Sequence, residues 1–171
     1  DRTIFTVSQN DHGDPCECDN CHAVDEREGS YMGTLLQFVN QVAEAIEEEH
    51  PDKFISTLAY AYSRKPPKTT RPRNNVLIRL SDIEGCFSHP LGTCTYTCNR
   101  DATVSVVDDI KKWSEISDQL FIWDYVMNFQ HWLAPQPNLY VLKPNMQFFV
   151  KYSVKEMFPQ ADPFNPMGEL I

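Results

Sequence analysis

Apolar residues along the chain follow two alternating patterns, and their order predicts the fold. Short apolar runs rich in β-branched and aromatic residues predict five strands, over residues 3–8, 53–62, 76–85, 119–126 and 153–158. Between the first two runs, apolar residues recur at helical spacing. This predicts a helix that begins at Ser30, a candidate cap, and ends near His50, just before Pro51.

The later part of the chain repeats this alternation of strands and helices. Asp101 is the predicted N-cap of a helix that carries Val106, Ile110 and Trp113. Pro144 suits the first turn of a short helix that carries Met146, Phe149 and Val150. Residues 63–75 differ, because they are basic, broken by prolines and without helical spacing. We therefore expect an extended crossover between the second and third strands.

Strands that alternate with helical segments predict an α/β protein with a parallel sheet. Five strands are too few for a closed eight-stranded barrel, so we expect either an open sheet or part of a (β/α)8 TIM barrel. A length of 171 residues suits one domain, and no linker or internal repeat divides the chain. Residues 1–171 are therefore predicted to form a single domain.

Charge and hydropathy narrow the classes of function. The formal net charge of −9 argues against binding nucleic acid, because neutralising phosphates requires a basic surface. No apolar run reaches the length that spans a bilayer, so no membrane span is expected. Six cysteines, an even number, permit disulfides in an oxidising compartment, and we expect a secreted, periplasmic or cell-surface protein. The sequence begins at Asp1 rather than Met and shows neither the basic nor the apolar region of a signal peptide, so a signal is not visible in it, and we expect a segment of a longer protein.

Acidic residues follow three of the predicted strands. Because the carboxyl ends of parallel strands meet at one edge, these acids are expected to converge. The candidates for catalysis are Asp11, Glu84 and Asp124. Glycoside hydrolysis needs such carboxylates, one to protonate the leaving oxygen and another to activate water or attack the sugar. The alternative is that they are ordinary caps and turn formers, which are common at strand ends.

Polar and aromatic residues at the same edge are candidates for substrate binding. Aromatic rings stack on the apolar face of a sugar, so flat side chains near the strand ends favour a carbohydrate site. The candidates are Asn10, Tyr60, Tyr62, Arg64, His131 and Trp132. Alternation along the fourth strand places Trp123 and Tyr125 on the face opposite Asp124, so these three cannot all line one cavity.

The basic loop and the cysteines each allow two interpretations. In the first interpretation of the basic loop, the Arg64 guanidinium binds the carboxylate of an acidic sugar. The favoured interpretation is that residues 63–75 form a solvated loop. The motif C-x-C-x2-C-H offers soft metal ligands, and a structural zinc would use Cys16, Cys18, Cys21 and Cys86. Disulfides to the later cysteines are the favoured alternative, and no cofactor is predicted for the reaction.

Several longer motifs resemble one bacterial family. They include "SQND", "TLAYAYSRKPPKTTRPR", "IRLSDIEGCFSHPL", "IWDYVMNF" and "VLKPNMQFFVKY". Together they resemble DUF 4838, a domain of unknown function described as an α-glucuronidase-like TIM barrel of the glycoside-hydrolase type. The resemblance extends over about residues 3–158 and implies that the strands are about the fourth to eighth of a barrel. It also implies that Asn10–Asp11 supplies the acid, and that Glu84 and Asp124 are candidates for the base.

Two functions are therefore expected. The first is a glycoside hydrolase-like domain that acts on oligosaccharide or polysaccharide, with uronic acids as one substrate class. The second is a non-catalytic carbohydrate-binding or structural module whose loops are braced by disulfides or zinc. Half a barrel exposes sheet edges and apolar faces, so the fragment alone is expected either to self-associate or to rearrange. It is not expected to be active alone, even if the full-length parent is a glycosidase.

Overall fold

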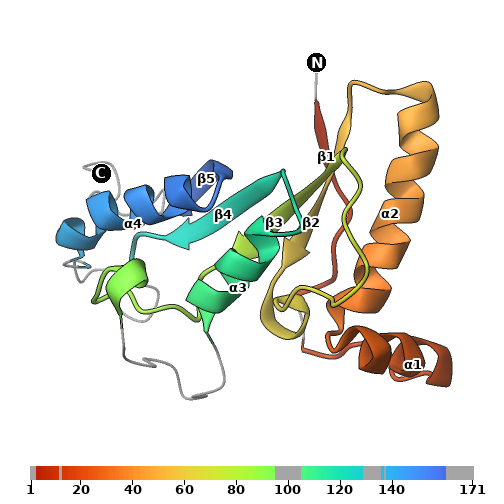
Figure 1. Ribbon diagram of the computed structural model, residues 1–171, viewed down its shortest axis with the longest axis horizontal. Helices are drawn as coiled ribbons and strands as arrows, with labels where there is room; N and C mark the ends of the chain where they lie inside the picture. Colours follow the sequence, from red (N-terminus) through yellow and green to blue (C-terminus); the bar gives the residue numbers. More distant parts are fainter. Residues whose placement is uncertain (1–2, 12, 95–104, 129–135, 137, 161–171) are drawn as a thin grey trace.

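The computed structural model describes residues 3–11, 13–94, 105–128, 136 and 138–160. Five parallel strands form one curled sheet in sequence order (Figure 1). They are β1 (Ile4–Thr6), β2 (Phe54–Ala59), β3 (Val76–Ser81), β4 (Leu120–Tyr125) and β5 (Val154–Gln160). Each strand pairs only with its neighbours in the chain, as expected for consecutive units of a barrel. The predicted α/β class and partial barrel are confirmed.

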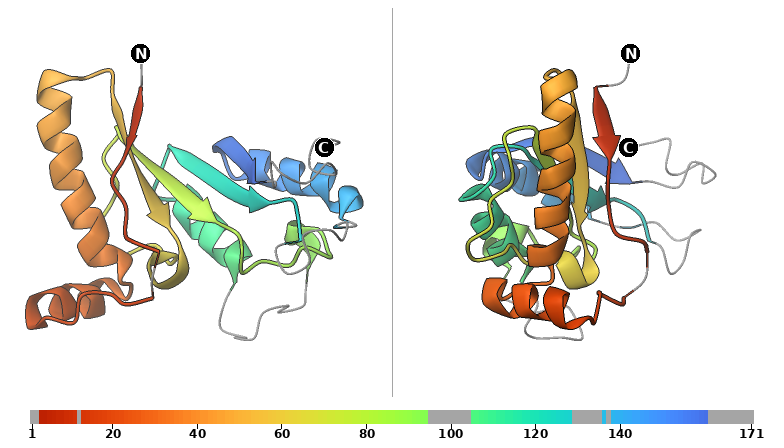
Figure 2. Two further views of the ribbon diagram at one scale, coloured as in Figure 1. Left: turned by 180° about the vertical axis from the view of Figure 1, so that it is seen from behind. Right: turned by 90° about the vertical axis from the view of Figure 1, so that its right-hand side faces the viewer.

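Four α-helices accompany the sheet in the described part of the chain. They are α1 (Asp19–Glu28), α2 (Met32–Glu49), α3 (Val106–Ser114) and α4 (Leu139–Lys151). Helices α2, α3 and α4 lie along one face of the sheet (Figure 2). The core fills the space between them, with fully buried side chains such as Leu36, Ile78, Ile110, Trp113 and Ile122. The sheet therefore has one face covered by helices and an opposite, concave face.

Helix α1 was not predicted from the sequence. Its two buried side chains, Asp25 and Glu28, are acidic, so no apolar period marks it. The helix ends at Gly29, whose φ of 65° is left-handed and whose N–H bonds the carbonyls of Asp25 and Glu26. Polar contacts rather than apolar burial therefore position α1.

The starts of two helices correct the sequence-based predictions. Asp101 lies outside the described residues, and α3 begins at Val106, where the Ser105 hydroxyl accepts from the Asp108 N–H at 3.2 Å. The prediction that Pro144 lies in a first turn was wrong, because it lies inside α4, which begins at Leu139. Burial of Val141, Phe148 and Phe149 on one face of α4 offsets the backbone hydrogen bond that proline cannot make.

An extended crossover joins β2 and β3, as predicted, but it is bonded to α2 rather than freely solvated. The Asn40 side chain accepts from the Arg73 N–H at 3.0 Å and donates to the Arg71 carbonyl at 2.8 Å. The Arg73 guanidinium contacts Glu44 at 3.1 Å and Glu47 at 2.7 Å. Side chains of α2 thus hold the crossover in the place that a helix would occupy in a regular β/α unit.

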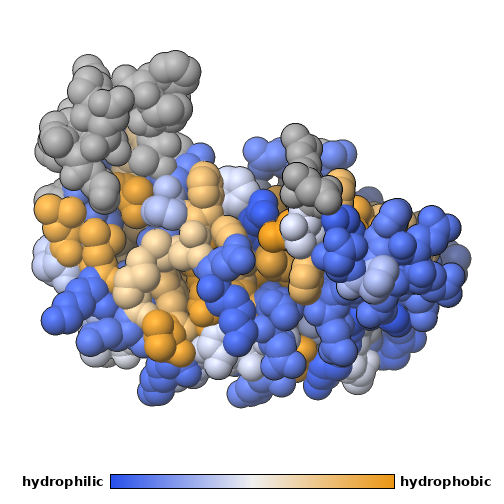
Figure 3. Space-filling model, turned by 90° about the horizontal axis from the view of Figure 1, so that it is seen from above, coloured by the Kyte–Doolittle hydropathy of each residue, from blue (hydrophilic) through white to orange (hydrophobic). Residues whose placement is uncertain are grey.

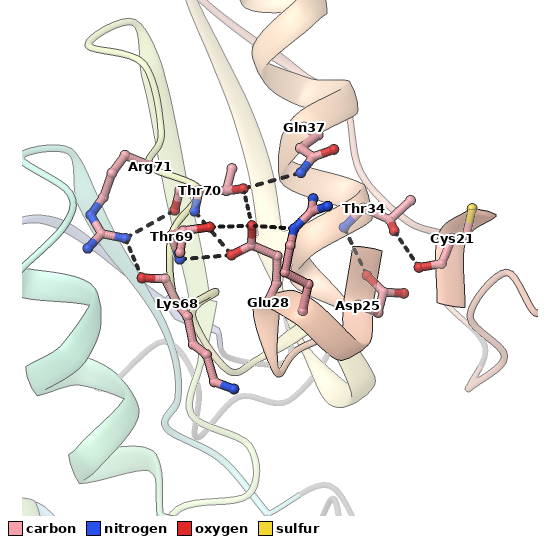
Figure 4. A network of polar contacts seen from close by, with 10 residues as sticks. Cys21, Asp25, Glu28, Thr34, Gln37, Lys68, Thr69, Thr70 and Arg71 are labelled. Carbon is pink, nitrogen blue, oxygen red and sulfur yellow. Dashed lines mark hydrogen bonds and ion pairs between the residues drawn. The ribbon is translucent and has the colours of Figure 1, made fainter. Parts of the chain in front are cut away.

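The carboxylate of Glu28 ties the crossover to α1 (Figure 4). It accepts from the N–H and hydroxyl of Thr69 at 2.8 and 2.6 Å, and from those of Thr70 at 3.1 and 2.9 Å. Burial, the largest single effect, raises the pKa of Glu28, but the hydrogen bonds together outweigh it and lower the pKa to about 2. The ionised carboxylate is therefore part of the folded structure.

We expect Glu28→Gln to lose roughly 2–3 kcal/mol of unfolding free energy at neutral pH, because an amide cannot accept all four hydrogen bonds. The folded pKa lies below the ordinary glutamate value of 4.5, so this stability is present above that pH and is lost as the pH falls toward 2. Urea denaturation between pH 2 and pH 7 measures the effect. Exposed Glu48→Gln is the control, and a gap between wild type and Glu28→Gln that does not narrow in acid would contradict the assignment.

Apolar side chains are exposed mainly near the C-terminal elements. In Figure 3 they gather on the side where α4 and β5 lie, whereas the α2 side is mostly hydrophilic. Leu139, Tyr140 and Val150 of α4 are each more than half exposed. None of the helices that the structure describes is long and apolar enough to cross a membrane. Self-association of the chain stays a prediction.

Candidate functional site

A cavity of about 310 Å³ lies at the carboxyl ends of the strands. Every strand, or the segment that follows it, contributes to the lining, which consists of Gln9, Asn10, Asp11, Leu58, Tyr60, Ser81, Trp123, Tyr125 and Gln160. Side chains two residues apart in a strand point to the same face of a sheet. This alternation explains why Leu58 and Tyr60, and likewise Trp123 and Tyr125, line the same cavity. We call this the strand-end cavity.

Asp11 and Tyr60 form the acidic corner of the strand-end cavity. Burial raises the pKa of Tyr60, and a hydrogen bond with the Asp11 carboxylate adds to the effect. The backbone here is fixed by Gln9, whose amide donates to the Tyr60 carbonyl at 3.1 Å and accepts from the Ser63 hydroxyl. Asp11 itself is exposed, so a ligand can reach its carboxylate.

Aromatic rings form the opposite wall. The indole N–H of Trp123 donates to the Gln160 side chain at 2.5 Å, and its ring meets Phe158 edge-on with centroids 5.1 Å apart. Burial raises the pKa of Tyr125, which keeps its hydroxyl protonated at neutral pH. On the same face, the Arg79 guanidinium lies 5.7 Å from the Trp123 ring. The wall thus combines flat apolar surface with hydrogen-bonding groups.

Glu84, Arg64 and Tyr62 surround a different cavity, of about 560 Å³. The Arg64 guanidinium pairs with Glu84 and, at 2.5 Å, with buried Asp109, so both sides of its fork are occupied by protein carboxylates. Tyr62 contacts Tyr31 edge-on, with ring centroids 6.0 Å apart. The predicted substrate residues are therefore divided between two cavities.

One strained residue explains this division. Ala61, between the two tyrosines, has a left-handed φ of 49°, which a residue with a side chain rarely adopts. The turn that it makes sends Tyr60 into the strand-end cavity and Tyr62 into the neighbouring one. A prediction based on strand ends alone could not separate them.

Asp124 lies on the helix-covered face, as the alternation along β4 predicted. Its carboxyl group hydrogen-bonds with that of Asp82, and the two residues are only 5% and 3% exposed. Burial raises the pKa of both groups, and the pKa of Asp82 is raised further by the neighbouring Asp124 charge. This pair lies beside α4 and does not face the strand-end cavity.

The cysteines that the structure describes form two groups rather than one. The sulfur atoms of Cys16, Cys18 and Cys21 all lie within 4.8 Å of one another, a set that could hold a soft metal ion. These three residues are free thiols, and a hydrogen bond with Cys16 is the main cause that raises the pKa of Cys21 to about 12. Cys86 is not part of this group, because its sulfur lies beside His89 instead.

Sequence reasoning missed part of the cavity, and part lies beyond the described residues. Six residues of the lining were not predicted as site residues, namely Gln9, Leu58, Ser81, Trp123, Tyr125 and Gln160. Alternation along the strands carried the signal for Ser81, Trp123 and Tyr125. His131 and Trp132 lie outside the described residues, so their role in substrate binding stays a prediction.

Comparisons with known proteins place the whole chain in one family. No curated protein and no solved structure matches it. A family model described as a domain of unknown function (DUF4838) matches residues 1–169. The match covers all five strands and both cavities. The chain therefore belongs to the DUF4838 family.

Proposed function

We propose that the chain is the carbohydrate-binding part of a glycoside hydrolase-like barrel, in which Asp11 is the catalytic acid. The observation that carries this proposal is the strand-end cavity, to which each of the five strands or the segment after it contributes. Together they supply one carboxylate, several amides and hydroxyls, and aromatic rings. Oligosaccharides and polysaccharides are the substrate class, and sugars that contain uronic acids are the first to test.

The lining suits a sugar ring. The faces of Trp123 and Tyr125 offer apolar surface to the C–H groups of a pyranose. Gln9, Asn10 and Gln160 supply donors and acceptors for its hydroxyls. The exposed carboxylate of Asp11, held beside the Tyr60 hydroxyl, would exchange a proton with a glycosidic oxygen.

Hydrolysis requires a second carboxylate or an equivalent group. Among the residues that the structure describes, Asp11 is the one carboxylate in the lining of the strand-end cavity. Glu84 remains a candidate partner for a substrate that spans both cavities, although it is paired with Arg64. Asp124 would act only indirectly, because it faces the helices. The second candidate function is carbohydrate binding without catalysis. The observation that supports it is that the described lining holds only one carboxylate.

Trp123→Ala is expected to weaken oligosaccharide binding roughly 10-fold, because it removes a stacking surface from the strand-end cavity. Calorimetry of the full-length protein with neutral and uronic-acid-containing oligosaccharides measures the affinity. Phe38→Ala is the matched control, since Phe38 is an exposed aromatic residue on α2 away from the cavity. Equal affinity of Trp123→Ala and wild type for a bound oligosaccharide would reject the proposed site.

A further inference from the structure

We propose that Cys86, His89 and Cys94 bind a zinc ion. The Cys86 sulfur lies 3.2 Å from Nδ1 of His89, and the ligand atoms of all three residues lie within 4.8 Å of one another. Tetrahedral zinc has bonds of about 2.3 Å to sulfur and 2.0 Å to nitrogen, which places its ligand atoms roughly 3.5–3.8 Å apart. The three side chains therefore need only small movements to share one ion.

The spacing of the three residues also fits zinc. Two residues separate Cys86 from His89 and four separate His89 from Cys94, intervals that are typical of zinc-binding loops. The sequence alone suggested that Cys86 would join the cysteines near α1. The structure instead brings it together with His89, which the sequence alone favoured as a hydrogen-bonding partner rather than a ligand.

The loop that carries the site is held in place by α4. The Leu91 N–H donates to the Asn145 side chain at 2.8 Å, and the Tyr140 hydroxyl donates to the Ser88 carbonyl at 2.7 Å. Gly92 packs so closely on Phe148 that a Cβ atom would lie 2.9 Å from its ring. These contacts fix the backbone around the three ligands, so little conformational entropy is lost when an ion binds.

The three ligands can supply the negative charge that zinc needs, and solvent can reach them. Zinc binds the thiolate form, so each cysteine releases one proton and two thiolates neutralise the ion, with His89 as a neutral ligand. Cys86 is buried, whereas His89 is exposed and gives the ion a route from solvent. Water or another donor takes the fourth coordination position. The site lies in the loop after β3, which contributes Ser81 to the strand-end cavity, so the ion would brace that part of the sheet.

The test must separate this site from the three thiols near α1. We therefore use the full chain with Cys16→Ser, Cys18→Ser and Cys21→Ser as the background, purified under reducing conditions without chelators. Elemental analysis is expected to find one equivalent of zinc in this background. Replacement by Co²⁺ should give the intense d–d bands of a tetrahedral site and a sulfur-to-cobalt charge-transfer band.

Variants of the ligands in this background complete the test. Cys94→Ser and His89→Gln should each weaken metal binding at least about 10-fold, whereas His50→Gln, at the end of α2, should leave it unchanged. Circular dichroism shows that each variant is folded, and exposed His89 is the substitution that least disturbs packing. The proposal is overturned if the background protein with the three serine substitutions binds no added Zn²⁺. It is also overturned if a folded Cys94→Ser variant binds zinc as the background does, or if mass spectrometry finds a disulfide between Cys86 and Cys94.

Discussion

An Arg64→Met variant is expected to lose roughly 3–5 kcal/mol of unfolding free energy, because it leaves a buried carboxylate without its counter-charge. The Arg64 guanidinium and the Asp109 side chain are only 6% and 5% exposed and lie 2.5 Å apart. The guanidinium also pairs with Glu84. Methionine keeps much of the side-chain volume but removes the charge and the hydrogen-bond donors of the guanidinium. Urea denaturation followed by circular dichroism measures the loss.

Two further variants show that the loss comes from the buried charge. Arg73→Met removes a comparable pair of contacts, to Glu44 and Glu47, at the surface, and is expected to cost less than about 1 kcal/mol. Adding Asp109→Asn to Arg64→Met should recover part of the lost stability, because the uncompensated carboxylate is then gone. An Arg64→Met variant as mild as Arg73→Met would show that Arg64 is not needed for the fold and is available to a ligand.

In the full-length protein, Asp11→Asn is expected to lower turnover by roughly 10²–10⁴-fold while oligosaccharide binding persists. The amide has nearly the same shape as the carboxylate and still hydrogen-bonds with Tyr60, but it cannot donate a proton to the leaving oxygen. Turnover of an aryl uronide or oligosaccharide that the wild type hydrolyses measures the first effect. Calorimetry with the same sugar measures the second.

Asp14→Asn is the matched control for Asp11→Asn. It makes the same change in the same segment, but Asp14 does not line the strand-end cavity. Unchanged turnover in Asp11→Asn would remove Asp11 from the mechanism. Loss of binding together with turnover would make Asp11 a binding residue rather than the acid.

The sheet could be predicted from the sequence because its signals are local. Apolar runs such as residues 76–81 mark the strands, and the prolines of the β2–β3 crossover exclude a helix there. Helix α1 and the position of Pro144 could not be predicted. Helix α1 depends on hydrogen bonds that the Glu28 carboxylate accepts from Thr69 and Thr70. The position of Pro144 depends on burial of α4 against the sheet.

The candidate site was only partly predictable, for a related reason. The predicted strand ends indicate the edge of the sheet at which polar residues lie. Asn10, Asp11 and Tyr60, which were predicted at that edge, do line one cavity. Which way each side chain points depends on contacts between distant residues. The pairing of Arg64 with Asp109 spans 45 residues, and the left-handed turn at Ala61 has no glycine to reveal it. Sequence spacing carries neither signal.

Fluorine NMR of the protein labelled with 5-fluorotryptophan tests the carbohydrate site most directly. Trp123 lines the strand-end cavity, whereas Trp113 is fully buried in the core and donates its indole N–H to the Arg64 carbonyl at 2.8 Å. With an oligosaccharide that calorimetry shows to bind, the Trp123 resonance should shift and the Trp113 resonance should stay unchanged. A bound oligosaccharide that leaves the Trp123 resonance in place would contradict a carbohydrate site at the carboxyl ends of these strands.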